Sequence, residues 1–133
     1  MSKSKIIFAT FFLLMLSLSA FGQANLTIQN NSIRSMTVKI MKGSNNKGTL
    51  HQIVSIGAHC SATVNFSNTG YYFTKTKAVL VGKIAIYQKG KPFHVVNDDT
   101  GYSVLKLTFT IKESTVPQVS GGELISKSEF DLN

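Results

Sequence analysis

The feature that most constrains this chain is an alternation of apolar and polar residues with a period of two. It is clearest in residues 102–111, where Leu105, Leu107, Phe109 and Ile111 alternate with Lys106, Thr108 and Thr110. Successive side chains of a β-strand point to opposite faces of its sheet, so this spacing predicts a strand with one buried and one solvated face. Strands of this kind are typical of antiparallel sheets.

The same alternation recurs along the chain and is interrupted about every ten residues by clusters of Gly, Asn, Asp and Ser. We expect strands at 25–29, 36–40, 50–56, 62–66, 71–76, 78–88, 93–96 and 102–111. Within 78–88, Gly82 and Lys83 are expected to form a bulge. No part of residues 23–133 predicts an amphipathic helix. The pattern predicts an all-β domain, an antiparallel β-sandwich of about seven to nine strands with Ig-like or jelly-roll-like connections.

Residues 1–22 have the three parts of a secretory signal peptide. A short basic start precedes an apolar stretch from Ile6 to Leu18. The small residues Ala20 and Gly22 then precede the expected cut before Gln23. The apolar stretch is shorter than the roughly 20 residues that span a bilayer. We therefore expect cleavage, with an uncleaved N-terminal anchor as the alternative.

The signal resembles those of exported proteins of Gram-negative bacteria, so the expected location is the periplasm or the exterior. No transmembrane segment is expected after cleavage, because no second apolar stretch is long enough. Residues 23–133 are expected to form one β-sandwich domain. Its C-terminal segment, residues 117–133, is expected either to add an edge strand around Leu124 and Ile125 or to pack loosely.

Charge is unevenly distributed along the chain. Residues 23–92 contain nine basic residues and no acid, and all six acids follow with three more lysines, so residues 23–133 carry a net charge of +6. A field of one sign attracts anionic partners such as acidic saccharides or lipid head groups. The alternative is that the lysines only solvate outward strand faces and protect strand edges.

Aromatic residues close to glycine turns extend this hypothesis, because aromatic faces beside polar groups are typical of sugar sites. The candidate ligand-binding residues are Lys75, Lys77, Tyr71, Tyr72 and Tyr102. Packing in the core or at its rim is the alternative for the tyrosines.

The single cysteine, Cys60, excludes an intramolecular disulfide. We expect it to be buried, because free cysteine is among the most buried residue types. A bridge between chains, or a reactive thiol beside a histidine, is the alternative. A zinc site formed with His51, His59 and His94 is not favoured, because the chain lacks closely spaced ligand pairs.

Asn97, Asp98 and Asp99 offer oxygen ligands for calcium within one loop. The same residues are ideal for a turn, which is the favoured interpretation. No other cofactor is indicated.

We therefore expect an exported, non-catalytic binding module that acts on an anionic or saccharide ligand at the cell envelope or outside it. The alternative is a protein-binding module, an inhibitor or an assembly subunit, that uses a sheet edge. A cysteine-dependent enzyme is a third and disfavoured option. The candidate partners are a glycan, an anionic lipid or a protein, and nucleic acid is not expected for an exported chain.

Overall fold

The computed structural model describes residues 23–44, 47–113, 118–119 and 122–132, which are almost entirely β-structure. The predicted signal peptide, residues 1–22, lies outside the described residues. In the described ranges, no helix is both long enough and apolar enough to cross a membrane.

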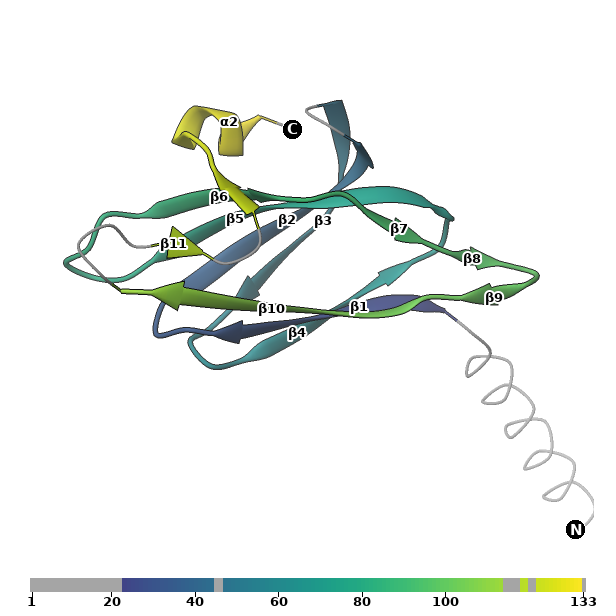
Figure 1. The fold of residues 1–133 in the computed structure, drawn as a ribbon, viewed down its shortest axis with the longest axis horizontal. Coiled ribbons are helices and arrows are strands. Elements are labelled where there is room, and N and C mark those ends of the chain that lie inside the picture. The colour runs from purple at the N-terminus through teal and green to yellow at the C-terminus, as the bar shows by residue number, and fades with distance from the viewer. Residues whose placement is uncertain (1–22, 45–46, 114–117, 120–121, 133) are drawn as a thin grey trace, which may run out of the picture.

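Two sheets face each other and enclose the core (Figure 1). The first sheet has the order β11 (Gln118–Val119), β10 (Val104–Lys112), β1 (Ala24–Asn31) and β4 (Ser61–Phe66). The second has the order β12 (Gly122–Leu124), β6 (Ile86–Gly90), β5 (Gly70–Val79), β2 (Ser35–Ser44) and β3 (Lys47–Ile56). β7 (Phe93–Val95) also pairs with β5, while β8 (Asn97–Asp98) and β9 (Gly101–Tyr102) form a small hairpin. The predicted all-β sandwich is confirmed.

One strand pair departs from the antiparallel expectation. β1 lies between β4 and β10, antiparallel to β4 but parallel to β10. A period of two is the same in either strand direction, so the alternation in the sequence could not distinguish the two pairings.

The core consists of the inward side chains of both sheets. In β1 the buried apolar residues are Ala24, Leu26 and Ile28, at every second position. Facing them from the second sheet are, among others, Met36, Val38, Ile40, Tyr72 and Ala78. The side chains between these positions point outward, and this parity decides which residues are available for binding.

The expected single strand over 78–88 is wrong. β5 ends at Val79 and β6 begins at Ile86, and the chain turns between them. The backbone N–H of Lys83 donates to the carbonyl of Leu80 at 3.0 Å, and Gly82 has a φ of +82°. A positive φ at the third position is what a type II turn requires and glycine readily adopts. The apolar neighbours of Gly82 concealed this turn.

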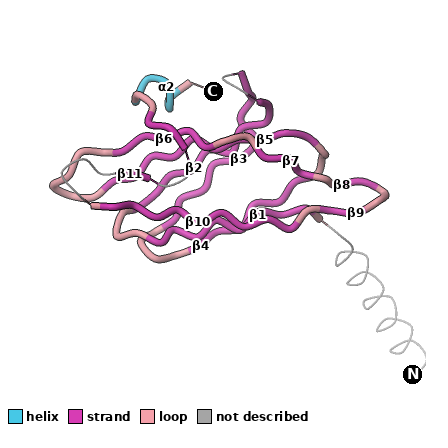
Figure 2. The backbone as a smooth tube through the Cα atoms, in the orientation of Figure 1, coloured by secondary structure: helices cyan, strands magenta, loops and turns pink. Residues whose placement is uncertain are grey.

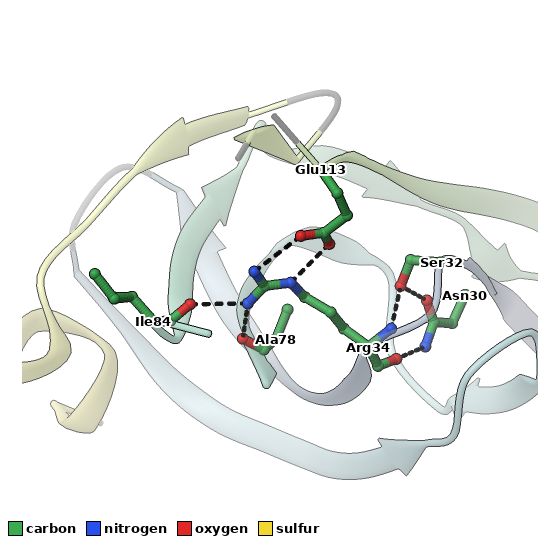
Figure 3. Close-up of polar contacts among 6 residues, drawn as sticks. All are labelled: Asn30, Ser32, Arg34, Ala78, Ile84 and Glu113. Atoms are coloured by element: carbon green, nitrogen blue, oxygen red, sulfur yellow. Dashed lines mark hydrogen bonds and ion pairs between the residues drawn. The ribbon is translucent and has the colours of Figure 1, made fainter. Parts of the chain in front are cut away.

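A fully buried arginine joins distant segments of the fold (Figure 3). Nε and Nη2 of Arg34 donate to the two carboxylate oxygens of Glu113, at 2.8 and 3.1 Å. Nη1 donates to the backbone carbonyls of Ala78, at 3.2 Å, and Ile84, at 2.9 Å. Arg34 therefore connects the start of β2 with the end of β5, the loop before β6 and the end of β10.

The backbone around Arg34 is fixed by two buried polar side chains (Figure 3). Nδ2 of Asn30 donates to the carbonyls of Arg34, at 2.7 Å, and Gly57, at 3.0 Å. The hydroxyl of Ser32 donates to Oδ1 of Asn30 at 2.6 Å and accepts from the N–H of Arg34 at 3.2 Å. The polar side chains of Asn30, Ser32 and Arg34 thus each have hydrogen-bond partners, as burial demands.

Replacing Glu113 by glutamine should lower the free energy of unfolding by about 2 kcal/mol, because it leaves the buried Arg34 charge without a counter-charge. The hydrogen bond from Arg34 lowers the pKa of the Glu113 carboxyl from its ordinary 4.5. The stabilisation is therefore complete above about pH 4.5 and is lost as the pH falls through the lower folded-state pKa.

Urea unfolding between pH 7 and pH 3 would measure this effect. The wild-type protein should lose stability on acidification more steeply than Glu113→Gln. Asp131→Asn, which removes an exposed carboxylate, is the control. Equal slopes for the wild-type protein and Glu113→Gln would contradict the assigned role of the pair.

Candidate functional site

Three lysines form a row across the outer face of the second sheet. The register places Lys39 of β2 opposite Lys75 of β5, and Lys75 opposite Lys89 of β6. Residues directly opposite each other in an antiparallel pair point to the same face, so the three ammonium groups gather there. Like charges in this arrangement repel, so the row needs groups of opposite polarity.

The short helix α2 (Lys127–Asp131) lies over this row (Figures 1 and 2). Nζ of Lys39 donates to the carbonyl of Phe130 at 2.9 Å. Nζ of Lys75 donates to the carbonyls of Glu129, at 2.9 Å, and Leu132, at 3.0 Å. The last carbonyls of a helix have no partner within the helix and carry partial negative charge, so they suit ammonium donors.

Carboxylates and an aromatic ring complete the cover. Nζ of Lys89 lies 3.4 Å from a carboxylate oxygen of Glu123 and 3.9 Å from one of Glu129. The buried ring of Phe130 lies 4.7 Å from Nζ of Lys39 and 5.5 Å from the ring of Tyr87. The described part of the 117–133 segment is thus packed against the sheet through β12 and α2.

The helix changes the prediction made for Lys75. Its side chain is only 5% exposed and is occupied by carbonyls, so it is not an open ligand contact. Burial is the main cause that lowers the pKa of Lys75, and the charge of Glu129 partly opposes it. Lys77 is half-buried on the same outer face of the sheet as Lys75. Its neighbours on the adjacent strands are Thr37 of β2 and Tyr87 of β6.

Tyr72, another candidate ligand residue, is not open to a ligand in the structure, because its side chain points into the core. It is buried, its hydroxyl donates to the carbonyl of Asn68 at 3.1 Å, and its ring lies 4.6 Å from that of Phe66. Tyr71 points the other way and is exposed, with its ring 4.7 Å from that of His94.

Tyr102 is exposed in the β8–β9 hairpin, at the end of the sandwich where β5 begins (Figure 1). Lys75 lies four residues beyond Tyr71 in β5, which is about 13 Å along a strand. The structure therefore does not bring the predicted tyrosines and lysines together at one site.

A cavity of about 530 Å³ lies beside the lysine row. Its lining residues are Phe73, Lys89, Gly90, Lys91, Pro92, Gly122 and Glu123. We call it the outer pocket. Its volume is within the range of small-molecule sites, about 300–1,000 Å³. Sequence reasoning missed it because one wall is β12, whose pairing with β6 depends on a contact between distant segments.

Gly122 shows how closely this wall approaches β6. A Cβ atom at Gly122 would lie 2.4 Å from the carbonyl oxygen of Lys89 and 2.4 Å from Nε2 of Gln88. Only glycine allows the two backbones to come this near. A second cavity, of about 340 Å³, lies along the same Gly90–Pro92 segment and is lined by Leu107 and Phe109 of the other sheet.

The calcium candidates serve as a turn. Oδ1 of Asp98 accepts hydrogen bonds from the N–H and the hydroxyl of Thr100, at 2.8 and 2.5 Å, and these bonds lower the pKa of Asp98. Nδ2 of Asn97 donates to the carbonyls of Phe66 and Ser67, and Asp99 lies at the exposed tip. Among the residues that the structure describes, no three His, Cys, Asp or Glu side chains are grouped to hold a metal ion.

The expected burial of Cys60 is wrong, since its side chain is exposed. Cys60 closes a turn in which its N–H donates to the carbonyl of Gly57 at 3.1 Å and His59 has a positive φ of 57°. His51, one of the histidines considered as a partner for the thiol, stacks on the ring of Phe66, with 5.0 Å between ring centroids. The general burial preference of cysteine does not hold for a residue placed by a surface turn.

Comparison of the chain with protein-family models gave no match, nor did comparisons with curated proteins and with solved structures. Inference about function therefore starts from the outer pocket, the lysine row and the exposed surfaces.

Replacing Phe130 by alanine should lower the free energy of unfolding by about 3 kcal/mol, because it removes a buried ring from between α2 and the sheet. It should also increase hydrogen exchange in residues 126–132. Urea unfolding and hydrogen exchange measure the two effects. Leu132→Ala, which truncates an exposed neighbour, should stay within about 0.5 kcal/mol of the wild type. A similar small effect for Phe130→Ala would contradict the described packing.

Proposed function

We propose that the protein is an exported, non-catalytic binding module that holds an anionic saccharide in the outer pocket. The observation that carries this proposal is a cavity whose lining combines two lysines, Lys89 and Lys91, with Pro92 and the buried ring of Phe73. Apolar walls with a few placed polar groups are typical of ligand sites. Lysine is a charge partner for carboxylate or sulfate groups on sugars.

The charge around the pocket supports an anionic ligand. Lys91 is exposed, so its ammonium group can turn toward a ligand. Lys89 already faces Glu123 and Glu129, but it belongs to the row with Lys39 and Lys75, in a chain whose residues 23–133 carry a net charge of +6. The excess positive charge favours an anion over a neutral or cationic ligand.

The composition of the pocket suits binding better than catalysis. The ionisable groups among its described lining residues are Lys89, Lys91 and Glu123, and Glu123 is paired with Lys89. A nucleophile aligned with a base is what covalent catalysis requires, and the described lining residues contain no Ser, Thr, Cys or His.

An array of sulfated, uronic-acid and neutral oligosaccharides, probed at low and at moderate salt, tests the proposal. Binding should favour the acidic oligosaccharides and weaken with salt. Lys91→Glu should weaken binding by about tenfold, because it places a like charge beside the ligand. Lys106→Glu, on an exposed position of β10, makes the same charge change in the other sheet. Equal losses in both variants, or no binding at all, would overturn the proposal.

A second function is favoured by the edge of the second sheet. β3 has ten residues and pairs only with β2 among the described strands. Leu50 and Ile53 are exposed on it, and residues 48–56 contain no Lys, Arg, Asp, Glu or Pro. Edges are commonly protected by lysine, proline, shortness or a bulge. β3 has a lysine at its first residue and a register shift at His51, but it is long and contains no proline. Pairing with β3 of a second copy would make the protein an assembly subunit.

Sedimentation over a wide range of protein concentration tests this second candidate. The wild-type protein should form a dimer as its concentration rises, and Ile53→Lys should shift dimerisation to about tenfold higher concentration by placing two lysines at the contact. Val104→Lys adds the same charge on β10, away from this edge, and should have no effect. A wild-type protein that stays monomeric throughout would contradict self-association through β3.

A further inference from the structure

One end of the sandwich carries four exposed apolar side chains. The loop between β5 and β6 forms this end in Figure 1, and its residues Val81 and Ile84 are 98% and 89% exposed. Val79, at the end of β5, is 40% exposed, and Ile33, in the turn before β2, is 52% exposed. Arg34, next to Ile33, binds the carbonyl of Ile84, so turn and loop lie side by side. We call these four residues the apolar tip.

The exposure of the tip is imposed by its backbone. The turn from Leu80 to Lys83 is closed by a hydrogen bond of 3.0 Å, and the φ of Gly82 places Val81 at the corner. The carbonyl of Ile84 is held by the buried Arg34 guanidinium, and its side chain points away from that guanidinium (Figure 3). A clustered set of exposed apolar residues marks an interaction surface more often than scattered ones do.

The size of the tip argues against a protein partner. Stable protein interfaces use about 20–30 residues on each side, whereas the tip has four residues at the narrow end of a loop. A lipid surface is different, because a few apolar side chains can enter it while flanking cations stay at the head groups.

The charge of the tip suits an anionic lipid surface. Lys83 is exposed and lies between Val81 and Ile84 in sequence. The carboxylate near it, Glu113, is shared with Arg34, so these three groups carry a net charge of +1. No acidic residue occurs in residues 23–97, and residues 23–133 carry a net charge of +6. Each basic group near an anionic surface adds to the attraction.

We propose that the apolar tip docks the protein onto a bilayer that contains anionic lipid. Val81 and Ile84 enter the boundary between head groups and acyl chains, and Lys83 contacts lipid phosphates. None of these residues lines the outer pocket, so docking and saccharide binding are separate activities.

Co-sedimentation with vesicles tests the docking. The protein used is residues 23–133, which hold the whole described fold and lack the apolar stretch at 6–18 that would itself bind lipid. Vesicles of phosphatidylcholine with phosphatidylglycerol should bind the protein, and vesicles of phosphatidylcholine alone should bind it at least about tenfold more weakly. Equal binding to both would overturn the role of anionic lipid.

Substitutions locate the contact. Val81→Ser with Ile84→Ser should reduce partitioning into the anionic vesicles by about tenfold or more. Val104→Ser with Leu132→Ser removes two other exposed apolar side chains and should leave partitioning unchanged. Lys91→Glu, in the outer pocket, should alter it by less than Lys83→Glu does. Equal loss in the two double variants would overturn the proposal.

A fluorescent reporter gives a second readout, because the chain contains no tryptophan. Val81→Trp places a single indole at the tip, and its emission should shift to shorter wavelength when anionic vesicles are added. Leu132→Trp is the matched control and should show no shift. Binding of the Val81→Trp protein without any shift would show that the tip stays in water and would overturn insertion.

Discussion

The buried charge of Arg34 is the interaction on which the rest of the structure depends. A guanidinium removed from water is tolerated only when its donors are satisfied and its charge is paired. Arg34 meets both conditions by collecting two backbone carbonyls and one carboxylate from three other segments of the chain. Arg34 therefore holds together the end of β5, the loop before β6 and the end of β10. This contact also positions β6, which lies between the apolar tip, in the loop before it, and the outer pocket, at its end.

The outer face of the second sheet shows a different use of charge. Its central row is made of lysines, and the segment that covers them supplies helix carbonyls and carboxylates. A polar cover of this kind holds α2 in one position, because each ammonium group needs its own acceptor. The neighbouring outer pocket takes its charge from the same row, which links the packing of α2 to the electrostatics of the pocket.

Local pattern in the sequence was sufficient for the sandwich, since strands such as β10 follow the period of two closely. Several features depend on contacts that a local pattern does not contain. The burial of Lys75 requires residues 126–132 to return over β5, and the parallel pairing of β1 requires a partner about 80 residues away. Tyr72 could have been placed in the core, because it shares the parity of Ala78 in β5. The turn at Gly82 was missed because its neighbours Val81 and Ile84 are apolar, which is typical of a buried strand, whereas both are exposed in the structure.

The position of β1 has a consequence for how the chain folds. β1 is the first strand in sequence but an interior strand of its sheet, and its parallel partner β10 is among the last to be synthesised. The contact between Arg34 and Glu113 spans 79 residues and closes at the same stage. Contacts of such long range are slow to form, because closing the loop loses chain entropy before any stabilising contact is made. A nascent chain that ends before β10 lacks both a partner for one side of β1 and the counter-charge for its buried arginine, so the native sandwich forms only when nearly the whole chain is available.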